Sequence, residues 1–449
     1  MKNLLISTSI IAALATAHPA LASDSEIETL RAQMQQMQQQ LEMMQNKLDA
    51  QEDKLATQKT KTTKVEKMAA AKAEKSGSNY KISFKPSPKI ESTDGQFSFQ
   101  PFGRAHLDYT AFNDDIKDHP SNGNFRRARL GFKGKFAKDF NYKFEMDFAK
   151  EAVNFKEISL TYGGFETADL KLGHFKPSLG LEENTSSNYI QFMERSNASN
   201  AFARDEEIGA AVLSGGDNWS FALGGFTGDA GNTSTNDDEA YSFDARGSFA
   251  PIAEKGKTLH VGIGASYRAG ADTTSFKAKE SGIGDSLVST GTITGVDNTV
   301  VLGAELAGVY NSFSAQAEYF RADVSRDAST DAGFDGYAVQ AGYLLTGESR
   351  PYSAKSGTFK RVKPNEPFSL SQGGIGAWEI LARYENLDLN DSGAGILGGE
   401  LDATTVGLNW YLNNNSRVMF NFIDVDTDSN AVVGNDSPQI YSARAAWDF

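Results

Sequence analysis

The sequence predicts an all-β transmembrane barrel of about 16 antiparallel strands, preceded by an N-terminal helical coiled coil. Apolar and polar residues alternate in segments from Gln96 to the end of the 449-residue chain, and aromatic residues lie at the ends of these segments. Between Ile27 and Leu55 the apolar residues instead recur every three and four positions. We therefore expect a signal peptide at 1–22, a coiled coil at 23–75, a linker at 76–95 and an outer-membrane β-barrel at 96–449.

The first residues have the features of a secretory signal peptide. Lys2 precedes an apolar stretch from Leu4 to Ala17, and Ala20 to Ala22 supplies the small residues that a signal peptidase recognises. A membrane-anchoring helix needs about 20 apolar residues, and His18 and Pro19 end this stretch too early. The sequence therefore predicts export, which leaves a soluble periplasmic protein and an outer-membrane barrel open at this point.

The next segment has the heptad pattern of a coiled coil. Its seam consists of Ile27, Leu30, Met34, Met37, Leu41, Met44, Leu48 and Leu55. Because glutamine and charged residues occupy the other positions, we expect this helix to associate with copies of itself in the periplasm. The alternative is a single amphipathic helix that docks on its own domain. The stretch KSGSNYKISFKPSPK, which ends at Lys89, is typical of a flexible linker.

The barrel prediction depends on strand length and on what covers the apolar faces. In one segment, Phe140, Tyr142 and Phe144 alternate with Asn141 and Lys143. Alternation would also suit a soluble antiparallel sheet, but segments of about 8 to 15 residues exceed the usual length of about 5 or 6. Every segment has an apolar face and none has an obvious partner layer, so we expect outer-membrane lipid to cover these faces.

Sixteen alternating segments can be counted, an even number as expected for such a barrel. They begin near Gln96, Phe125, Phe140, Phe155, Asp169, Glu207, Asn218, Ala240, Thr258, Thr299, Phe313, Gly336, Gly376, Ala403, Ser416 and Gln439. If the first strand begins in the periplasm, short turns lie on the periplasmic side and longer loops lie outside. The connection from Thr346 to Ile375 breaks this pattern, because it is long and would be periplasmic.

The third outer connection, from Pro177 to Glu207, is long and lacks strand alternation. The lumen of a 16-stranded barrel is wide enough to receive such a loop, so we expect the loop to fold inward and constrict the channel. The charged residues of this constriction loop are Glu182, Glu183, Glu194 and Arg195. The alternative is an external flap or a surface loop.

Composition argues against several other classes of protein. The chain has no cysteine and its five histidines show no paired spacing, so we expect no metal site and no cofactor. A net charge of −14 argues against a nucleic-acid partner. No nucleophile elbow or paired catalytic spacing is present, so we predict no enzymatic activity. A barrel hydrolase and a non-conducting adhesin or tether are the alternatives.

Five stretches resemble the phosphate-selective porin O and P family. They are FRRARLGFKGKF (125–136), LKLGHFKPSLGLEENTSSNYIQFMERS (170–196), GYLLTGESRPY (342–352), GAWEILARYENLDL (376–389) and TVGLNWYLNNNSRVMFNF (405–422). The resemblance spans the whole predicted barrel. It implies a homotrimeric outer-membrane porin whose third loop constricts a water-filled pore for anions such as phosphate or polyphosphate. The aromatic Phe449 also resembles the signal that the barrel-insertion machinery reads.

Basic residues in and near the inward-facing positions are the candidates for anion binding. They are Arg104, Arg126, Arg127, Arg129, Lys133, Lys135, Lys143, Lys171 and Lys176. In a narrow pore such cations lower the cost of partly dehydrating an oxyanion, and guanidinium groups bind phosphate oxygens in pairs. Carboxylates share the inward parity, and the loop from Gly228 to Glu239 is acidic. The alternative is therefore a general diffusion porin for small hydrophilic solutes without phosphate selectivity.

Overall fold

The computed structural model describes residues 79–449 apart from 85–86, 150–152, 229–239 and 280–283, together with Gln35, Gln39 and Met43. The last three residues are helical and exposed. The expected signal peptide, and the expected coiled coil apart from these three residues, lie outside the described residues. None of the helices among the described residues has the length and hydropathy of a membrane-spanning segment.

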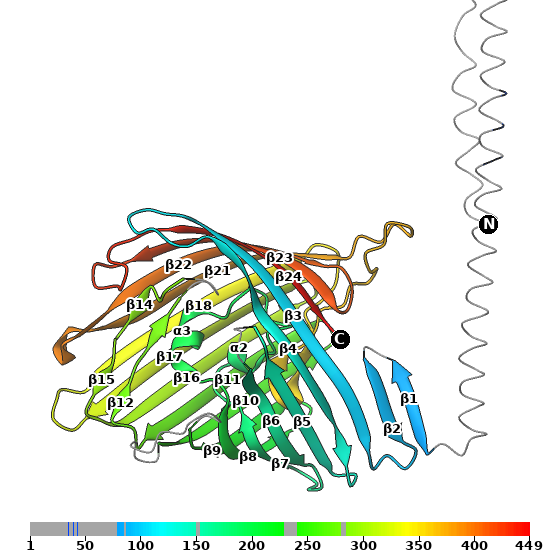
Figure 1. Ribbon diagram of the computed structural model, residues 1–449, viewed down its shortest axis with the longest axis horizontal. Coiled ribbons are helices and arrows are strands. Elements are labelled where there is room, and N and C mark those ends of the chain that lie inside the picture. Colours follow the sequence, from blue (N-terminus) through cyan, green and yellow to red (C-terminus); the bar gives the residue numbers. More distant parts are fainter. Residues whose placement is uncertain are drawn as a thin grey trace, which may run out of the picture. The chain divides into compact units, whose positions relative to one another are not determined.

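Sixteen antiparallel strands of the described residues form a closed barrel (Figure 1). They are β3 (Ser98–Asn113), β4 (Asn122–Phe136), β5 (Phe140–Asp147), β6 (Asn154–Tyr162), β7 (Asp169–Phe175), β8 (Glu207–Gly215), β9 (Trp219–Phe226), β10 (Tyr241–Glu254), β11 (Lys257–Ala269), β16 (Val296–Tyr310), β17 (Phe313–Arg326), β18 (Ala332–Leu344), β21 (Ala377–Asp391), β22 (Ile396–Tyr411), β23 (Ser416–Thr427) and β24 (Gln439–Asp448). Each strand pairs with the next one in this series, and β24 pairs with β3. The predicted barrel of sixteen strands is confirmed.

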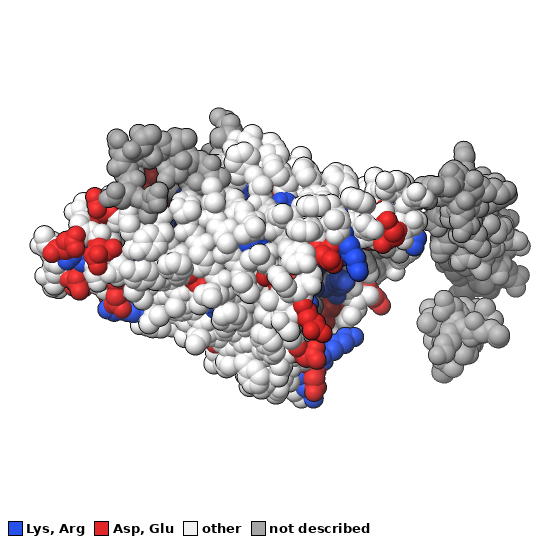
Figure 2. All heavy atoms as spheres, turned by 90° about the horizontal axis from the view of Figure 1, so that it is seen from below, with Lys and Arg blue, Asp and Glu red and all other residues white. Residues whose placement is uncertain are grey.

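The barrel wall turns apolar side chains outward and polar side chains inward. In β16, Leu302 and Leu306 are 50% and 52% exposed, whereas Glu305 is 5% exposed. On the outer face, the rings of Phe132 and Phe144 stack with their centroids 5.2 Å apart. Figure 2 shows a wall that is largely free of charged side chains, which gather toward the ends of the visible face. Such a surface is suited to contact with lipid.

Fourteen of the sixteen strands begin within three residues of their predicted starts. The larger differences concern β18, which begins at Ala332 rather than near Gly336, and β22, which begins at Ile396 rather than near Ala403. Ala332 and Phe334 belong to an interior apolar cluster, so the first part of β18 has apolar residues on its inward face. A register shift between β21 and β22 interrupts the alternation near the start of β22.

The segment expected to be a linker, residues 76–95, contains a β-hairpin. It consists of β1 (Tyr80–Phe84) and β2 (Pro88–Ser92), and β2 continues onto the barrel through pairing of Ile90 with Phe99. Tyrosine, isoleucine and phenylalanine alternate with lysine and serine in β1, which is the period of a strand. The expectation of a linker throughout this segment therefore differs from the structure, because backbone pairing extends ahead of β3.

The connections at the two ends of the barrel differ in length. One end has short turns at residues 137–139, 163–168, 216–218, 255–256, 311–312 and 412–415. Most connections at the other end are longer, although those at residues 327–331 and 392–395 are also short. The connection between β7 and β8 (residues 176–206) is called the inner loop. The exception at the short-turn end is the connection between β18 and β21 (residues 345–376), here called the inner turn.

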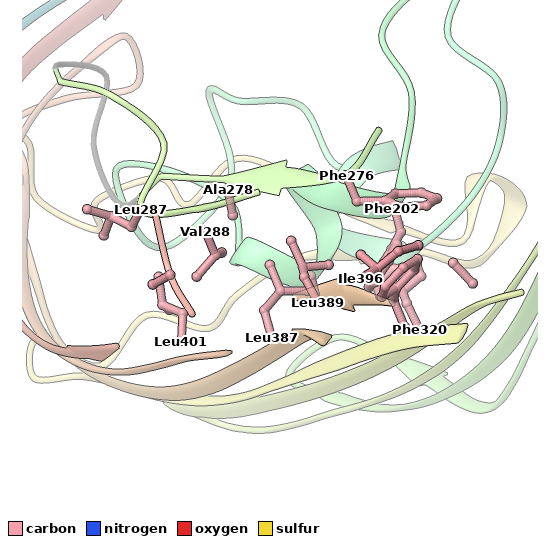
Figure 3. Packing of buried hydrophobic residues seen from close by; sticks show 14 of the residues in the cluster. Phe202, Phe276, Ala278, Leu287, Val288, Phe320, Leu387, Leu389, Ile396 and Leu401 are labelled. Atoms are coloured by element: carbon pink, nitrogen blue, oxygen red, sulfur yellow. The ribbon is translucent and has the colours of Figure 1, made fainter. Parts of the chain in front are cut away.

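The inner loop contains two short helices, α2 (Leu181–Asn184) and α3 (Asn197–Phe202). Phe202 at the end of α3 is fully buried in an apolar cluster inside the barrel (Figure 3). Phe276 and Val288, from the connection between β11 and β16, join this cluster, and Phe320 of β17 is one of its members from the wall. This packing attaches the inner loop to the wall at the end with long connections.

Candidate functional site

The inner loop lies against inward-facing residues of the barrel wall. Arg417 of β23 donates hydrogen bonds to the carbonyl oxygens of Ile190 and Ser187, at 2.8 and 3.1 Å. Arg383 of β21 donates to the carbonyl oxygen of Glu194 at 3.2 Å. Because both arginines are buried and charged, these bonds hold the middle of the loop at fixed places on the wall.

Further contacts attach the loop to β17 and again to β21, which lie across the barrel from β7 and β8, where the loop begins and ends. The carboxylate of Glu318 in β17 accepts hydrogen bonds from the backbone amides of Leu181 and Glu182, at 2.6 and 3.0 Å. The amide of Gln191 donates to Glu379 of β21 at 2.7 Å. The loop therefore crosses the interior of the barrel rather than forming an external flap.

The predicted constriction-loop residues mainly bind the loop to itself and to the wall. Glu182 accepts hydrogen bonds from Arg383 at 2.5 Å and from the backbone amide of Ser196 at 2.8 Å. Glu183 forms ion pairs with Lys176 and, at 3.1 Å, with Arg195. Arg195 also donates to the carbonyl oxygen of Glu182 at 3.0 Å. These side chains fix the shape of the loop where it turns.

The inner turn also folds into the barrel. The sequence had shown only that this connection is unusually long, and it did not predict where the connection lies. It contains β19 (Tyr352–Ser353), a short 3₁₀ helix η2 (Ala354–Ser356) and β20 (Thr358–Phe359). Arg246 of β10 donates to the carbonyl oxygen of Gly357 at 2.8 Å, and Phe359 packs in an apolar cluster with Leu181 of the inner loop. The two inward segments therefore meet inside the barrel. Its unusual length is the feature of the sequence that sets this connection apart from a simple turn.

A cavity of about 1660 Å³ lies between the inner loop, the inner turn and the wall from β3 to β10. Thirteen lysines and arginines line it, against eight aspartates and glutamates. The basic residues are Arg104, Arg126, Arg127, Arg129, Lys143, Lys156, Lys171, Lys176, Arg195, Arg204, Arg246, Lys355 and Lys360. The cavity lining thus carries an excess of positive charge, although the whole chain is acidic.

The structure brings seven of the nine predicted anion-binding residues to this cavity, and each of the seven has a carboxylate partner. These pairs are Arg104 with Glu145, Arg126 and Arg127 with Glu194, Arg129 with Asp147, Lys143 and Lys171 with Glu157, and Lys176 with Glu183. The predicted basic residues at the cavity are therefore paired with carboxylates of the wall and of the inner loop.

A bulge explains how two consecutive arginines reach the interior. In the pairing of β3 with β4, Arg127 lies opposite His106 and Phe125 lies opposite Leu107, so Arg126 is the extra residue. Arg126 and Arg127 both approach Glu194, at 2.9 and 3.4 Å. Strict alternation would turn one of the two side chains outward.

The lysines without an ion-pair partner among the described residues include Lys133, Lys135, Lys355 and Lys360. Lys133 and Lys135, both predicted anion-binding residues, lie outside the cavity lining. The amine of Lys133 instead lies 5.5 Å from the centroid of the Phe102 ring. Lys355 and Lys360 belong to the inner turn, and both line the cavity. The amine of Lys360 donates to the hydroxyl of Thr358 at 2.9 Å.

The protein environment lowers the pKa of two charged groups of the inner loop. Burial lowers the pKa of Lys176 to about 7, and Arg195 acts in the same direction. Burial alone would raise the pKa of the Glu194 carboxyl, but Arg126, Arg127 and Arg444 hold it well below its usual value. In the part of the chain that the structure describes, no group of three or more histidines and carboxylates could hold a metal ion.

Comparisons with known proteins agree with this architecture. The family model for "Phosphate-selective porin O and P" matches residues 99–449. Porin O of Pseudomonas aeruginosa is 31% identical over 398 residues, which cover 78% of this chain and 88% of that protein. The barrel is also similar to an anion-selective porin from Comamonas acidovorans, with a TM-score of 0.51, 13% identity, and coverage of 79% of this chain and 100% of that one. OmpT of Vibrio cholerae, in its trimer form, has a TM-score of 0.52, 11% identity, and coverage of 79% and 99%.

Proposed function

This chain belongs to the phosphate-selective porin O and P family, and we propose that its barrel is a water-filled, anion-preferring channel for phosphate and polyphosphate ions. As a member of a porin family it is a channel protein and not an enzyme. Its place is the outer membrane, where lipid covers the apolar outer wall. The proposal about selectivity rests on the charge of the cavity described above.

The observation that carries the proposed anion preference is the excess of basic side chains around the cavity. A pore with low-dielectric walls focuses the field of the charges that line it, so a local excess of positive charge raises the local concentration of anions. The net charge of −14 for the chain is carried elsewhere and is screened by salt over roughly 10 Å. The lining therefore favours anions even though the protein as a whole is acidic.

Within this lining, Lys355 and Lys360 are the strongest candidates for setting the preference, because neither has a carboxylate neighbour at ion-pair distance among the described residues. The hydroxyls of Ser356 and Thr358 line the same part of the cavity and can donate to an oxyanion. The six charge-paired wall cations and Lys176 of the inner loop would then form a polar stripe along which the anion exchanges water for protein donors. Lys133 and Lys135 would act only on the field near the barrel rim.

The inner loop is the proposed constriction. Its buried anchors on β17, β21 and β23 give it a fixed position in the interior, which a loop that narrows a channel requires. Glu182 and Glu194 would maintain this position through their ion pairs with wall arginines, and Glu183 and Arg195 through their pair within the loop. The inner turn would narrow the same channel from the opposite end.

The proposed assembly is a homotrimer, whose coiled coil at 23–75 lies in the periplasm after removal of a signal peptide at 1–22. The heptad seam supports self-association, and the trimer form of OmpT shows that a barrel of similar fold can assemble in this way. Residues 76–95 would then connect the coiled coil to the barrel, with the β-hairpin at its barrel end. The barrel-insertion machinery would recognise Phe449, whose aromatic ring follows β24.

A general diffusion porin is the second candidate, and the pairing of seven cavity cations with carboxylates favours it. The reversal potential of purified protein in a planar lipid bilayer, measured across a potassium chloride gradient, separates the two. The proposed function predicts a reversal potential of the sign for chloride, and a chloride current that phosphate reduces. A reversal potential near zero without any effect of phosphate would support the general porin.

A further inference from the structure

Three guanidinium groups surround the carboxylate of Glu194 in the inner loop. Arg444 of β24 lies 2.7 Å from Oε1, Arg126 lies 2.9 Å from Oε2, and Arg127 lies 3.4 Å from Oε1. One negative charge therefore faces three positive charges. Binding of an oxyanion by several arginines has the same geometry, with the carboxylate oxygens in place of phosphate oxygens.

The arginines retain unused capacity for an anion. Asp108 neutralises Arg444 through hydrogen bonds of 2.7 and 2.6 Å, whereas Arg126 and Arg127 have Glu194 as their only carboxylate partner in the described residues. The buried Nε atoms of Arg126 and Arg127 have no hydrogen-bond partner within that part of the chain. Donors therefore exceed the two acceptor oxygens that Glu194 supplies.

A solute anion could reach this cluster from the lumen. Arg126 and Arg127 both line the 1660 Å³ cavity, and 30% of the Arg126 side chain is exposed. The inner loop does not depend on Glu194 alone for its position, because Arg383 and Arg417 bind loop carbonyl oxygens and Glu318 binds loop amides. Neutralising Glu194 should thus leave the loop in place.

We propose that Glu194 is a specificity-determining residue, whose carboxylate occupies an anion site formed by Arg126, Arg127 and Arg444. By filling this site, Glu194 prevents solute anions from binding tightly at the inner loop. A channel needs such a limit, because an ion that binds too strongly to one site does not leave it. The inference rests on the proposed anion channel and adds a residue that limits how strongly the channel holds phosphate.

The test is the variant Glu194→Gln, which keeps the shape of the side chain and removes its charge. Chloride current through the purified porin in a planar bilayer is titrated with inorganic phosphate at constant ionic strength. The concentration of phosphate that halves the current should fall about tenfold, which corresponds to about 1.4 kcal/mol of tighter binding. The matched control is Asp205→Asn, because Asp205 lines the same cavity, its side chain is 87% exposed, and no arginine of the described residues lies at ion-pair distance from it.

The result that overturns the inference is an equal effect of Glu194→Gln and Asp205→Asn, since the effect would then be one of overall charge. The double variant Glu194→Gln with Arg126→Gln should lose the tighter phosphate block that Glu194→Gln alone produces. If Glu194→Gln does not assemble, Arg126→Gln alone is decisive: an occupied site predicts less than about a twofold change in phosphate block, and a larger loss of block contradicts occupation. A cation-selective wild-type pore would refute the proposed function, but a phosphate-specific gain in Glu194→Gln would still support this inference.

Discussion

Arg444 and Asp108 form a bidentate ion pair across the two strands that close the barrel. The guanidinium of Arg444 in β24 donates to both carboxylate oxygens of Asp108 in β3, at 2.7 and 2.6 Å. Both residues are buried, with exposures of 1% and 4%, and they lie directly opposite each other in the strand register. The first and last barrel strands are therefore joined by side chains as well as by the backbone.

Neutralising Asp108 should destabilise the closed barrel. In Asp108→Asn the buried Arg444 keeps only Glu194 as a charged partner, and breaking a buried ion pair in this way costs about 3 kcal/mol or more. The free energy of unfolding, measured by urea titration of the protein in detergent micelles, should fall by this amount. The control is Asp323→Asn, which removes one of the two carboxylate partners of the exposed Arg321 and should cost less than about 1 kcal/mol. Equal losses in both variants would contradict a role in barrel closure.

The strand pattern could be predicted from the sequence because a period of two is a local property. Residues near Phe140 and Phe313 mark strand starts by composition alone, and the structure begins β5 and β17 at these residues. The partners of the wall cations could not be predicted, since Arg126 and Glu194 are 68 residues apart and meet only after the inner loop enters the barrel. The inward position of Arg126 depends on a bulge, which alternation does not show.

The inner turn marks a second limit of sequence reasoning. Its length between Thr346 and Ile375 distinguishes it from the other connections at its end of the barrel, but no local pattern says where such a segment folds. Its position depends on contacts with distant wall residues, such as the bond from Arg246 to the carbonyl oxygen of Gly357. The position of Lys355 and Lys360 at the cavity could therefore not be predicted from the sequence.

Removing the charges of Lys355 and Lys360 should reduce anion preference. Both lysines line the cavity and have no carboxylate partner in the described part of the chain, so Lys355→Gln with Lys360→Gln removes two uncompensated charges. The reversal potential in a chloride gradient should move toward zero, and chloride permeability relative to potassium should fall several-fold. The control, Lys133→Gln with Lys135→Gln, removes the same charge outside the cavity lining and should change the ratio little. A larger effect of the control would place the selective region at the barrel rim.

Anion preference should fall as the pH rises from 6 to 8. Burial lowers the pKa of Lys176 to about 7, and a lysine is charged below its pKa and neutral above it. The side chain would change from about 90% protonated at pH 6 to about 10% at pH 8, although Glu183, Glu206 and Asp205 face the same amine. The reversal potential should record this change. In Lys176→Arg the charge persists over the whole range, so a pH response that survives in this variant would assign the response to another group.

Releasing one anchor of the inner loop should disturb the channel. Arg417 donates charged hydrogen bonds to the carbonyl oxygens of Ile190 and Ser187, and each such bond contributes about 1.5 to 3 kcal/mol. In Arg417→Ala the loop should move more, so single-channel recordings should show larger current fluctuations and a higher mean conductance. Arg321→Ala, which removes an exposed arginine of β17, should leave the current unchanged. An unchanged current in Arg417→Ala would mean that the loop does not limit conduction.

The ring of Phe449 should matter for assembly of the barrel in the membrane. Phe449 and Gly103 exchange backbone hydrogen bonds of 3.1 and 3.2 Å, which extends the pairing of β24 with β3 by one residue. A Cβ atom at Gly103 would lie 2.8 Å from the ring, so the ring packs directly over this glycine. Phe449→Ala keeps the backbone bonds and removes the aromatic surface at the end of the strand, where interfacial aromatic side chains gather in such barrels.

The amount of folded Phe449→Ala protein in the outer-membrane fraction should fall several-fold while the periplasmic precursor accumulates, because export does not depend on this ring. Phe449→Tyr retains an aromatic ring and should insert as well as the wild type. Normal insertion of Phe449→Ala would mean that the ring serves only for local packing over Gly103.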